Sequence, residues 1–452
     1  MKKVVRTISG VTPLAVMLKP RPCPHGKCDY CPSYSGVPES YTPTSPVVLR
    51  AIDCNYDPRR QVEARLKIMG LMGHATDKIE LIVMGGTFTA YPADYRRGFV
   101  KGCFEGMNGA AAAGLEEAKK ANETAKHRCV AMCLETRPDW CKEEHIDEML
   151  DIGATRVEIG VQTLDDKTQA ATHRGHGTAE VIEATRLLKD SCFKVGYHMM
   201  LGLPGATPES DVETFRTLFS DERFQPDQVK IYPTFVIKGT PLEKAFNAKD
   251  FKPYTTGQIV DTIVRIKQIV PQHVRIMRVM RDIPAQYIAS DCRYSHLRDA
   301  IKERMNTTGA KCGCIRCREV GHGMRAGKHA GNMELKRTDY NASGGKEIFL
   351  SFESDWMIAS LLRLRLPGSP FRPELDGAAL VRELHTFGPQ AAIGTPGEWQ
   401  HKGYGRRLMA EAESVAKEAG YEKMAVIAGV GVREYFYKLG YKLDGPYVSK
   451  AL

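Results

Sequence analysis

Three cysteines near the amino end of the chain are close enough together to hold one metal centre. Cys23, Cys28 and Cys31 lie in the run RPCPHGKCDYCPSY, with four and then two residues between them. Three thiolates can bind three irons of a four-iron cluster and leave the fourth iron open. A structural zinc ion is the alternative, because His25 could complete the four ligands that zinc prefers.

A second group of cysteines lies far along the chain, in the run AKCGCIRCREVG. Cys312, Cys314 and Cys317 predict a structural zinc site, and a second iron–sulfur cluster or three unliganded thiols are the alternatives. The other seven cysteines are scattered, and we expect them to be small buried hydrophobic residues. Candidates for the fourth zinc ligand are Cys292, His296 and His322.

A third pattern is the run QHKGYG at residues 400–405, at the start of a predicted helix. Glycines let the backbone approach a pyrophosphate, and the helix N-terminus offers N–H groups and positive potential. A plain turn is the alternative for so short a motif.

The elements that must position these residues alternate between strands and helices over the first two thirds of the chain. Short apolar runs predict strands, and runs such as Val181–Asp190 and Pro208–Ser220 predict helices between them. This alternation predicts a full or partial α/β barrel, with a doubly wound open sheet as the alternative. The predicted strands are Leu14–Leu18, Ile79–Met84, Cys129–Leu134, Arg156–Val161, Lys194–Leu201, Gln228–Val236 and Val274–Val279.

Several of these strands end in polar or glycine-rich turns, among them those at residues 85–87, 135–138, 162–163 and 202–205. The carboxyl ends of parallel strands meet at one edge of the sheet, where the active sites of such folds lie. We therefore expect a site at this edge.

The last quarter of the chain predicts a separate α/β unit. Before it, Gly321–Lys346 is rich in Gly, His, Lys and Arg without clear periodicity, which predicts an exposed linker. The predicted elements of the unit are strand Ile348–Phe352, apolar segment Trp356–Leu366, strand Ala379–His385, helix Tyr404–Ala419, strand Lys423–Ile427 and helix Val432–Leu439.

The chain carries a formal net charge of +10, and its positive charge is concentrated in two stretches. Residues 1–70 contain 11 basic and 5 acidic residues, and residues 271–340 contain 14 and 7. This distribution is equally consistent with a polyanionic partner and with a merely basic surface. No apolar run is long enough to cross a bilayer, so we expect a cytoplasmic protein with no membrane partner.

Many runs of the chain together resemble one family, the catalytic subunit of Elongator and its archaeal and bacterial homologues. They are CPHGKCDYCP, DKIELIVMGGTFTAYP, LETRPDWC, TRVEIGVQTLDD, RGHGT, KCGCIRCREVG, RELHTFG, QHKGYGRRLMAEAE and GVGVREYFYKLGYKLDGPYV. The resemblance covers nearly the whole chain. It implies a partial radical S-adenosylmethionine barrel at 1–290, a basic zinc-binding connector at 291–340 and a GNAT acetyltransferase-like domain at 341–452.

The resemblance also implies the cofactors and the residues that bind them. The first three cysteines would hold a 4Fe-4S cluster whose open iron binds S-adenosylmethionine. Contacts to S-adenosylmethionine are implied for Gly85, Gly86, Thr87, Glu135 and Gln162. Contacts to acetyl-CoA are implied for Lys78, Glu383, Leu384, His385, Thr386, Gln400, Gly403, Tyr404, Gly405, Arg406, Tyr435 and Phe436.

The family commonly has two adjacent tyrosines where this chain has Tyr435 and Phe436. If the second hydroxyl acts on the thioester, Tyr435 or Tyr437 must replace it here. Lys78 matches a lysine that reaches acetyl-CoA from the barrel and is the third residue expected to take part in catalysis.

The activity implied by the resemblance is the modification of a tRNA anticodon. A 5′-deoxyadenosyl radical would take a hydrogen from the acetyl methyl group, and the carbon radical would add to carbon 5 of the wobble uridine. Hydrolysis would leave a carboxymethyl group. The expected partners are the tRNA anticodon stem-loop, acetyl-CoA, a one-electron donor and a second copy in a homodimer.

Two other functions use the same residues. A histone-type lysine acetyltransferase would keep the cluster as a structural part, and a tRNA-binding scaffold would catalyse nothing. The two basic stretches argue against the first, because a lysine-rich peptide needs an acidic surface.

Overall fold

The computed structural model describes residues 7–290 and 296–452, and its first sheet contains seven parallel strands in chain order. Because β1 and β7 are the edges of this sheet, it is a partial barrel, and the doubly wound alternative is wrong. All seven predicted strands are confirmed. They are β1 (Thr12–Met17), β2 (Lys78–Met84), β3 (Arg128–Thr136), β4 (Arg156–Gln162), β5 (Lys194–Leu201), β6 (Gln228–Pro233) and β7 (Arg275–Arg278).

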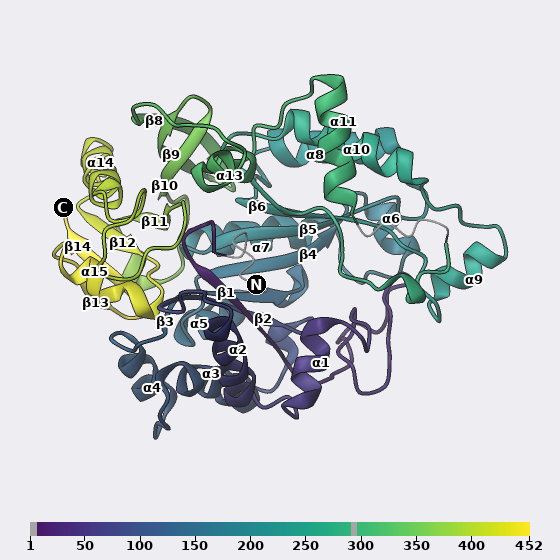
Figure 1. Ribbon diagram of the computed structural model, residues 1–452, viewed down its shortest axis with the longest axis horizontal. Helices are drawn as coiled ribbons and strands as arrows, with labels where there is room; N and C mark the ends of the chain where they lie inside the picture. The colour runs from purple at the N-terminus through teal and green to yellow at the C-terminus, as the bar shows by residue number, and fades with distance from the viewer. Residues whose placement is uncertain (1–6, 291–295) are drawn as a thin grey trace.

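Helices connect these strands and pack along the outside of the barrel (Figure 1). Strand β2 alternates buried and half-buried residues, whereas β4 is buried along almost its whole length. The apolar side chains of strands and helices form one continuous core. The helices are α1 (Pro46–Asp53), α2 (Pro58–Leu71), α3 (Ala93–Asn108), α4 (Leu115–Asn122), α5 (Glu143–Asp151), α6 (Asp166–Ala171), α7 (Thr178–Asp190), α8 (Pro208–Ser220), α9 (Pro241–Asn247), α10 (Thr256–Ile269) and α11 (Leu297–Thr308).

A second sheet of seven strands follows, in the order β13-β14-β12-β11-β10-β9-β8. It is mixed, because β11 and β12 are parallel while the other neighbours are antiparallel. Its core includes one face of α14. The elements are α12 (Ile315–Arg318), α13 (Val320–Arg325), β8 (Glu334–Ala342), β9 (Gly345–Ser354), β10 (Met357–Leu366), β11 (Ala378–Thr386), α14 (Tyr404–Glu418), β12 (Lys423–Val426), α15 (Arg433–Tyr437), β13 (Lys442–Asp444) and β14 (Tyr447–Ala451).

The predicted linker Gly321–Lys346 is wrong over much of its length, because it contains most of α13 and all of β8. Strand β8 is an edge strand, and nearly all of its side chains are exposed. Its backbone pairing with β9 therefore stabilises it without any apolar alternation in the sequence. No helix within the two described ranges is long and apolar enough to cross a membrane.

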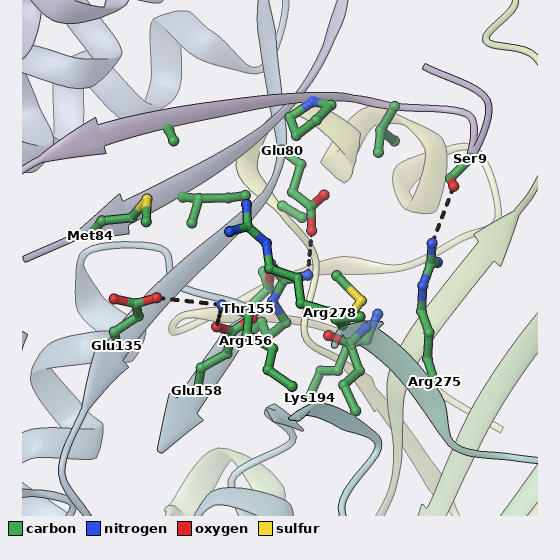
Figure 2. Close-up of a pocket in the computed structure, with 18 of the residues that line it drawn as sticks. Ser9, Glu80, Met84, Glu135, Thr155, Arg156, Glu158, Lys194, Arg275 and Arg278 are labelled. Carbon is green, nitrogen blue, oxygen red and sulfur yellow. Dashed lines mark hydrogen bonds and ion pairs between the residues drawn. The ribbon is translucent and has the colours of Figure 1, made fainter. Parts of the chain in front are cut away.

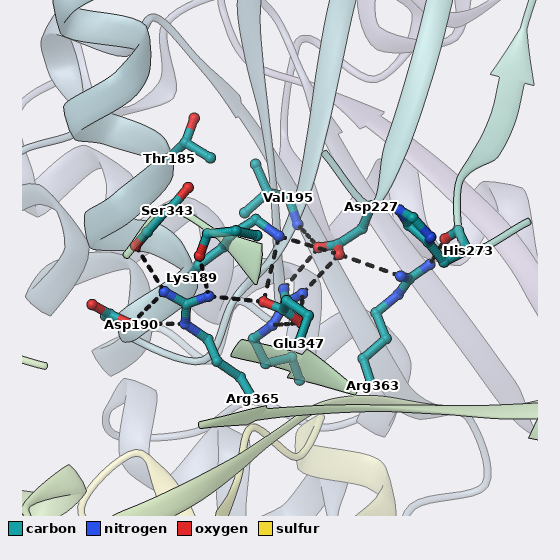
Figure 3. Close-up of polar contacts among 12 residues, drawn as sticks. Thr185, Lys189, Asp190, Val195, Asp227, His273, Ser343, Glu347, Arg363 and Arg365 are labelled. Atoms are coloured by element: carbon teal, nitrogen blue, oxygen red, sulfur yellow. Dashed lines mark hydrogen bonds and ion pairs between the residues drawn. The ribbon is translucent and has the colours of Figure 1, made fainter. Parts of the chain in front are cut away.

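Buried charges join the two sheets (Figure 3). Arg382 of β11 donates two hydrogen bonds to Asp227, which precedes β6, at 2.7 and 2.8 Å. The same guanidinium donates to Glu347 of β9 at 2.7 Å. Lys189 of α7 lies 3.7 Å from Asp227 and 3.5 Å from Glu347. Ionised groups without water need partners of opposite charge, and here Asp227 and Glu347 each have a cationic partner from the other unit, Arg382 and Lys189 respectively.

We expect Asp227→Asn to lower the free energy of unfolding by about 3–5 kcal/mol, because it leaves the buried cations Arg382 and Lys189 with Glu347 as their one remaining shared carboxylate. Urea unfolding measures the loss. The matched control is Glu63→Gln, which breaks an exposed pair with Arg59 and should cost no more than about 1 kcal/mol. Equal losses in the two variants would contradict this account of the interface.

A buried carboxyl group stands behind the turn that follows β5. The Gly202 N–H and the Tyr254 hydroxyl both donate to Oδ2 of Asp211, at 2.8 and 2.9 Å. Burial raises the pKa of Asp211 to about 6, although these two bonds lower it. Between about pH 4 and pH 6 the folded chain therefore holds a proton on Asp211 that the unfolded chain has released.

The free energy of unfolding should accordingly fall as the pH rises through that window. Asp211→Asn keeps one oxygen for both donors and removes the titration. Relative to the wild type, this variant should gain up to about 3 kcal/mol between about pH 4 and pH 7, measured by urea unfolding. A constant difference between the two proteins across this range would refute the assignment.

Candidate active site

One cavity of about 1370 Å³ joins the inside of the barrel to the second sheet. Strand residues such as Glu80, Glu135, Glu158 and Lys194 point into it from the barrel (Figure 2). On the other side its wall is formed by the end of β11, the start of α14 and part of α15. The predicted site at the carboxyl ends of the strands therefore extends into the second unit.

The first three cysteines lie in the loop after β1. The Sγ atom of Cys23 is 3.7 Å from Oγ1 of Thr87, and that of Cys28 is 3.2 Å from Nε2 of His25. Sγ of Cys31 is 2.8 Å from the Ser40 hydroxyl. Cys23 lines the cavity.

The spacing of these thiols tests which metal centre they fit. A single tetrahedral ion with bonds of about 2.3 Å would hold its thiolates about 3.8 Å apart. Two groups of three candidate ligands among the described residues lie within 4.8 Å of one another, and Cys23, Cys28 and Cys31 are not among them. Their wider arrangement fits a multi-iron cluster better than the zinc alternative with His25.

The charges around these thiols fit a metal centre. Burial raises the pKa of the Cys31 thiol to about 11, so the thiol is neutral without a metal. Arg174 donates to the Cys28 sulfur at 3.8 Å, and Arg137 and Arg174 both favour the thiolate of Cys23. A bound cationic cluster would supply the remaining positive charge that three thiolates require.

Four of the five residues implied to contact S-adenosylmethionine line the cavity: Gly86, Thr87, Glu135 and Gln162. A Cβ atom at Gly86 would meet nothing within 4 Å, so its backbone is open to a ligand. Gly85 lies behind it, where a Cβ atom would come within 2.9 Å of Leu18. Gln162 has a φ of 71°, a strained conformation for a side-chain-bearing residue at the end of a strand.

The residues implied to contact acetyl-CoA gather at a fork in the second sheet. Strand β11 pairs with β12 only from Ala378 to Val381, while its later residues 383–386 pair with β10 alone. Their other edge faces the cavity. The N-terminus of α14 opens beside them after Gly403, whose φ is 85°. This arrangement offers an extended edge and a helix N-terminus to a phosphate-bearing ligand.

Lys78 of β2 reaches the second unit. Its Nζ atom donates to Oε1 of Gln400 at 2.6 Å, and Nε2 of Gln400 donates to the carbonyls of Gly10 and Thr386 at 3.1 Å. Burial lowers the pKa of Lys78. The lysine and the glutamine both line the cavity.

The structure separates the two candidate tyrosines. Tyr435 lines the cavity, and its hydroxyl would be 2.9 Å from a Cβ atom at Gly405. Burial raises the pKa of Tyr435, so its hydroxyl remains a donor. Tyr437 does not line the cavity, and its hydroxyl lies 3.5 Å from Oε1 of Glu123. Phe436 is buried and stacks edge-on against Tyr435.

The second cysteine group has the spacing of a single-ion site. Ligand atoms of Cys312, Cys314 and Cys317 lie within 4.8 Å of one another, and neither His296 nor His322 joins them. Nζ of Lys267 donates to two of the sulfurs, at 3.2 and 3.4 Å. The third candidate for the fourth ligand, Cys292, lies outside the described residues. Six of the scattered cysteines are buried as predicted: Cys54, Cys103, Cys129, Cys133, Cys141 and Cys192.

The sequence did not predict a network of charged side chains that pair with one another inside the barrel. His198 of β5 lies 2.8 Å from Glu158 of β4, and Lys230 of β6 pairs with Glu158 and lies 3.5 Å from Glu135. Arg156 at the start of β4 forms an ion pair with Glu80 of β2 (Figure 2). The sequence signal for this network was the presence of charged residues inside otherwise apolar strands. Burial of a charged side chain costs free energy unless the side chain is paired or faces a polar cavity.

Comparison with known proteins agrees with this geometry. The Radical SAM superfamily matches residues 19–218, and the Radical_SAM C-terminal domain matches residues 226–307. A partial parallel barrel with cysteines beside its first strand is thus a radical SAM architecture, here joined to a second α/β unit.

The relatives and solved structures define a narrower group. The tRNA uridine(34) acetyltransferase of Dehalococcoides mccartyi is 51% identical over the full length of both chains. Human Elongator complex protein 3 is 41% identical over 100% of this chain and 86% of its own. The structure of the archaeal Methanocaldococcus infernus Elp3 with an N-terminal deletion covers 99% of this chain and 100% of its own, at 45% identity and a TM-score of 0.89. The chain belongs to the family of tRNA uridine(34) acetyltransferases and Elongator complex protein 3.

The short distance between the Tyr435 hydroxyl and the position of a Cβ atom at Gly405 allows a test of the acetyl-CoA site. Gly405→Ala places a methyl group 2.9 Å from the Tyr435 hydroxyl oxygen, which must move away, so acetyl-CoA binding should weaken at least about tenfold as measured by calorimetry. The helix itself should gain up to about 1 kcal/mol in stability, because alanine is the better helix former.

The double variant Gly405→Ala with Tyr435→Phe is the control, because it removes the oxygen that clashes. It should bind acetyl-CoA more tightly than Gly405→Ala alone. If the single variant binds as the wild type does, Tyr435 does not shape this site.

Proposed function

We propose that the chain forms a 5-carboxymethyl group on the wobble uridine of tRNA, using acetyl-CoA and S-adenosylmethionine. One observation carries the proposal: Cys23 and Thr87 line the same cavity as the edge of β11 and Tyr435. A radical generated at one end could therefore reach an acetyl group bound at the other. Relatives named tRNA uridine(34) acetyltransferase support the choice of substrate.

The cysteine loop would hold the radical-forming cofactors. Cys23, Cys28 and Cys31 would bind a 4Fe-4S cluster, with Arg137 and Arg174 offsetting thiolate charge. When bound, the cluster with S-adenosylmethionine supplies a one-electron cleavage that produces a carbon radical able to take a hydrogen atom from a methyl group. Gly86, Thr87, Glu135 and Gln162 would hold the S-adenosylmethionine in the barrel. The chemistry also requires a one-electron donor.

The fork in the second sheet would hold acetyl-CoA. Backbone groups of residues 383–386 can pair with an extended pantetheine arm, and the N-terminus of α14 can bind the pyrophosphate. Tyr435, whose hydroxyl keeps its proton, can donate a hydrogen bond to the thioester carbonyl. Lys78 would orient the acetyl end from the barrel side. Tyr437 is the weaker candidate for this role.

The charge of the cavity supports an RNA substrate. Sixteen lysines and arginines line it, against six aspartates and glutamates. An anticodon nucleotide could enter this positive cavity once it leaves the stack of its neighbours. The same charge disfavours a histone-type lysine acetyltransferase, whose substrate is itself positive.

Zinc is proposed for the second cysteine group. Three thiols within 4.8 Å of one another, next to the cation of Lys267, suit one tetrahedral ion. The ion would tie the start of α12 to the loop before it and stiffen the connection between the two units, while Lys267 of α10 donates hydrogen bonds to two of the sulfurs.

The central test is nucleoside analysis after anaerobic incubation of the protein with tRNA, acetyl-CoA, S-adenosylmethionine and a reductant. Wild-type protein should form carboxymethyluridine, and Cys28→Ser should lose iron and form none, because two thiolates do not hold the cluster. Acetyl-CoA should still bind to this variant. Cys54→Ser makes the same substitution outside the cavity and should keep both iron and activity.

Absence of the product from wild-type protein with a fully loaded cluster would reject the proposal. Product formation by Cys28→Ser would reject the radical route and favour the scaffold or ordinary acyl transfer.

A further inference from the structure

Two arginines on the wall of the cavity form no ion pair with any carboxylate of the described residues 7–290 and 296–452. Arg298 lies on α11 and Arg316 on α12, and both line the cavity. Nη2 of Arg298 donates to the carbonyl of Met277 at 3.3 Å. Within residues 7–290 and 296–452, Arg316 makes no hydrogen bond or ion pair.

A third arginine, Arg275 at the start of β7, forms an ion pair with the neighbouring carboxylate of Glu319. Its Nη2 atom lies 2.7 Å from Oε1 of Glu319 and donates to the Ser9 hydroxyl at 3.2 Å (Figure 2). The other oxygen of Glu319 accepts from Ser9 at 2.7 Å. Arg275 and Arg298 both repel the guanidinium of Arg316. Three positive charges thus face one carboxylate.

The neighbouring thiols do not supply the missing negative charge. Cys314 attracts both arginines, and Cys317 attracts Arg298. Three thiolates and one divalent cation would carry a single net negative charge, and Lys267 offsets it through its bonds to Cys312 and Cys317. The positive excess on the cavity wall remains when this site is filled.

We propose that Arg275, Arg298 and Arg316 form a phosphate-binding subsite, which holds a backbone phosphodiester of the bound RNA. A guanidinium binds two oxygens of a phosphate in a fixed fork, and a cluster of arginines recognises a phosphate more tightly than it recognises chloride or water. The inference rests on the proposed function and deepens it, because it names where the strand of the substrate is anchored.

The surroundings favour RNA over the phosphates of coenzyme A. Arg278 and Arg281 continue the positive wall toward the barrel, so that a polymer could place several phosphates along it. The coenzyme has its own phosphate site at the N-terminus of α14, beside residues 403–406. Both ligands nevertheless carry the same chemical group, and the experiment separates them.

The experiment measures binding by the full-length, reconstituted protein to a labelled anticodon stem-loop RNA, by fluorescence anisotropy from about 50 to about 200 mM salt. Arg316→Gln and Arg298→Gln should each weaken RNA binding several-fold and reduce the slope of log affinity against log salt by about 1. Arg316→Lys should retain part of the affinity, because it keeps the charge but loses the fork. Acetyl-CoA binding should be unchanged in all three variants.

Arg216→Gln is the matched control, because Arg216 is exposed on α8, pairs with Glu213 and does not line the cavity. It should leave the affinity and the slope as in the wild type. The melting temperature of Arg316→Gln should be at least that of the wild type, because the substitution removes a repelled charge. A lower melting temperature would indicate that Arg316 supports the fold rather than a ligand, and would overturn the inference.

Weakened acetyl-CoA binding with unchanged RNA binding would mean that the three arginines bind a phosphate of coenzyme A, and would overturn the RNA assignment. No change in either ligand would overturn the subsite itself. These measurements need no turnover. Failure of the wild type to make carboxymethyluridine would thus reject the proposed function, while the binding results would still decide whether the three arginines hold a phosphate.

Discussion

The buried charges between the two sheets are the constraint on which the rest of the molecule depends. Asp227 and Glu347 are ionised in a buried interface because cations surround them: Arg382 and Lys189 pair with both, Arg363 also pairs with Asp227 and Arg365 with Glu347. Apolar packing would allow many relative positions of two sheets. Bidentate bonds between arginine and carboxylate allow few, because both distance and direction must be satisfied.

This fixed junction makes one active-site cavity out of two incomplete ones. The barrel is open at its β1 and β7 edges, and the second sheet forks where β11 leaves β12. Neither opening encloses a reaction by itself. Held against each other, they bring Lys78 of β2 to Gln400 and place Tyr435 in a cavity shared with Cys23.

The positively charged residues of the two units fall into two groups, those paired with carboxylates and those without such a partner. Where positive groups join the sheets or line the barrel strands, carboxylates accompany them, as Glu383 accompanies Lys194 and Glu158 accompanies Lys230. Along the wall formed by α11 and α12, the cavity-lining Arg298 and Arg316 form no ion pair with a carboxylate of the described part of the chain. Structural cations are neutralised by the chain, whereas the remaining cations are available to a ligand.

The sequence by itself determined the parts that depend on local pattern. The seven parallel strands were predictable because buried strands require continuous apolar runs. The closely spaced thiols of Cys23, Cys28 and Cys31 likewise predicted a metal centre in the loop after the first strand. Strand β8 was not predictable, because an edge strand is stabilised by backbone pairing and tolerates polar side chains on both faces. The spacing of the cysteines also left zinc and iron open, and in the structure the sulfurs of Cys23, Cys28 and Cys31 do not all lie within 4.8 Å of one another.

Only the tertiary structure decided which distant residues share the site. Tyr435 and Tyr437 look equivalent in the sequence, but the turn of α15 sends one hydroxyl to Gly405 and the other to Glu123. Likewise, nothing local distinguishes the paired Arg382 from the unpaired Arg316. Contacts between residues hundreds of positions apart depend on how whole sheets pack, and the pattern of neighbouring residues does not encode that packing.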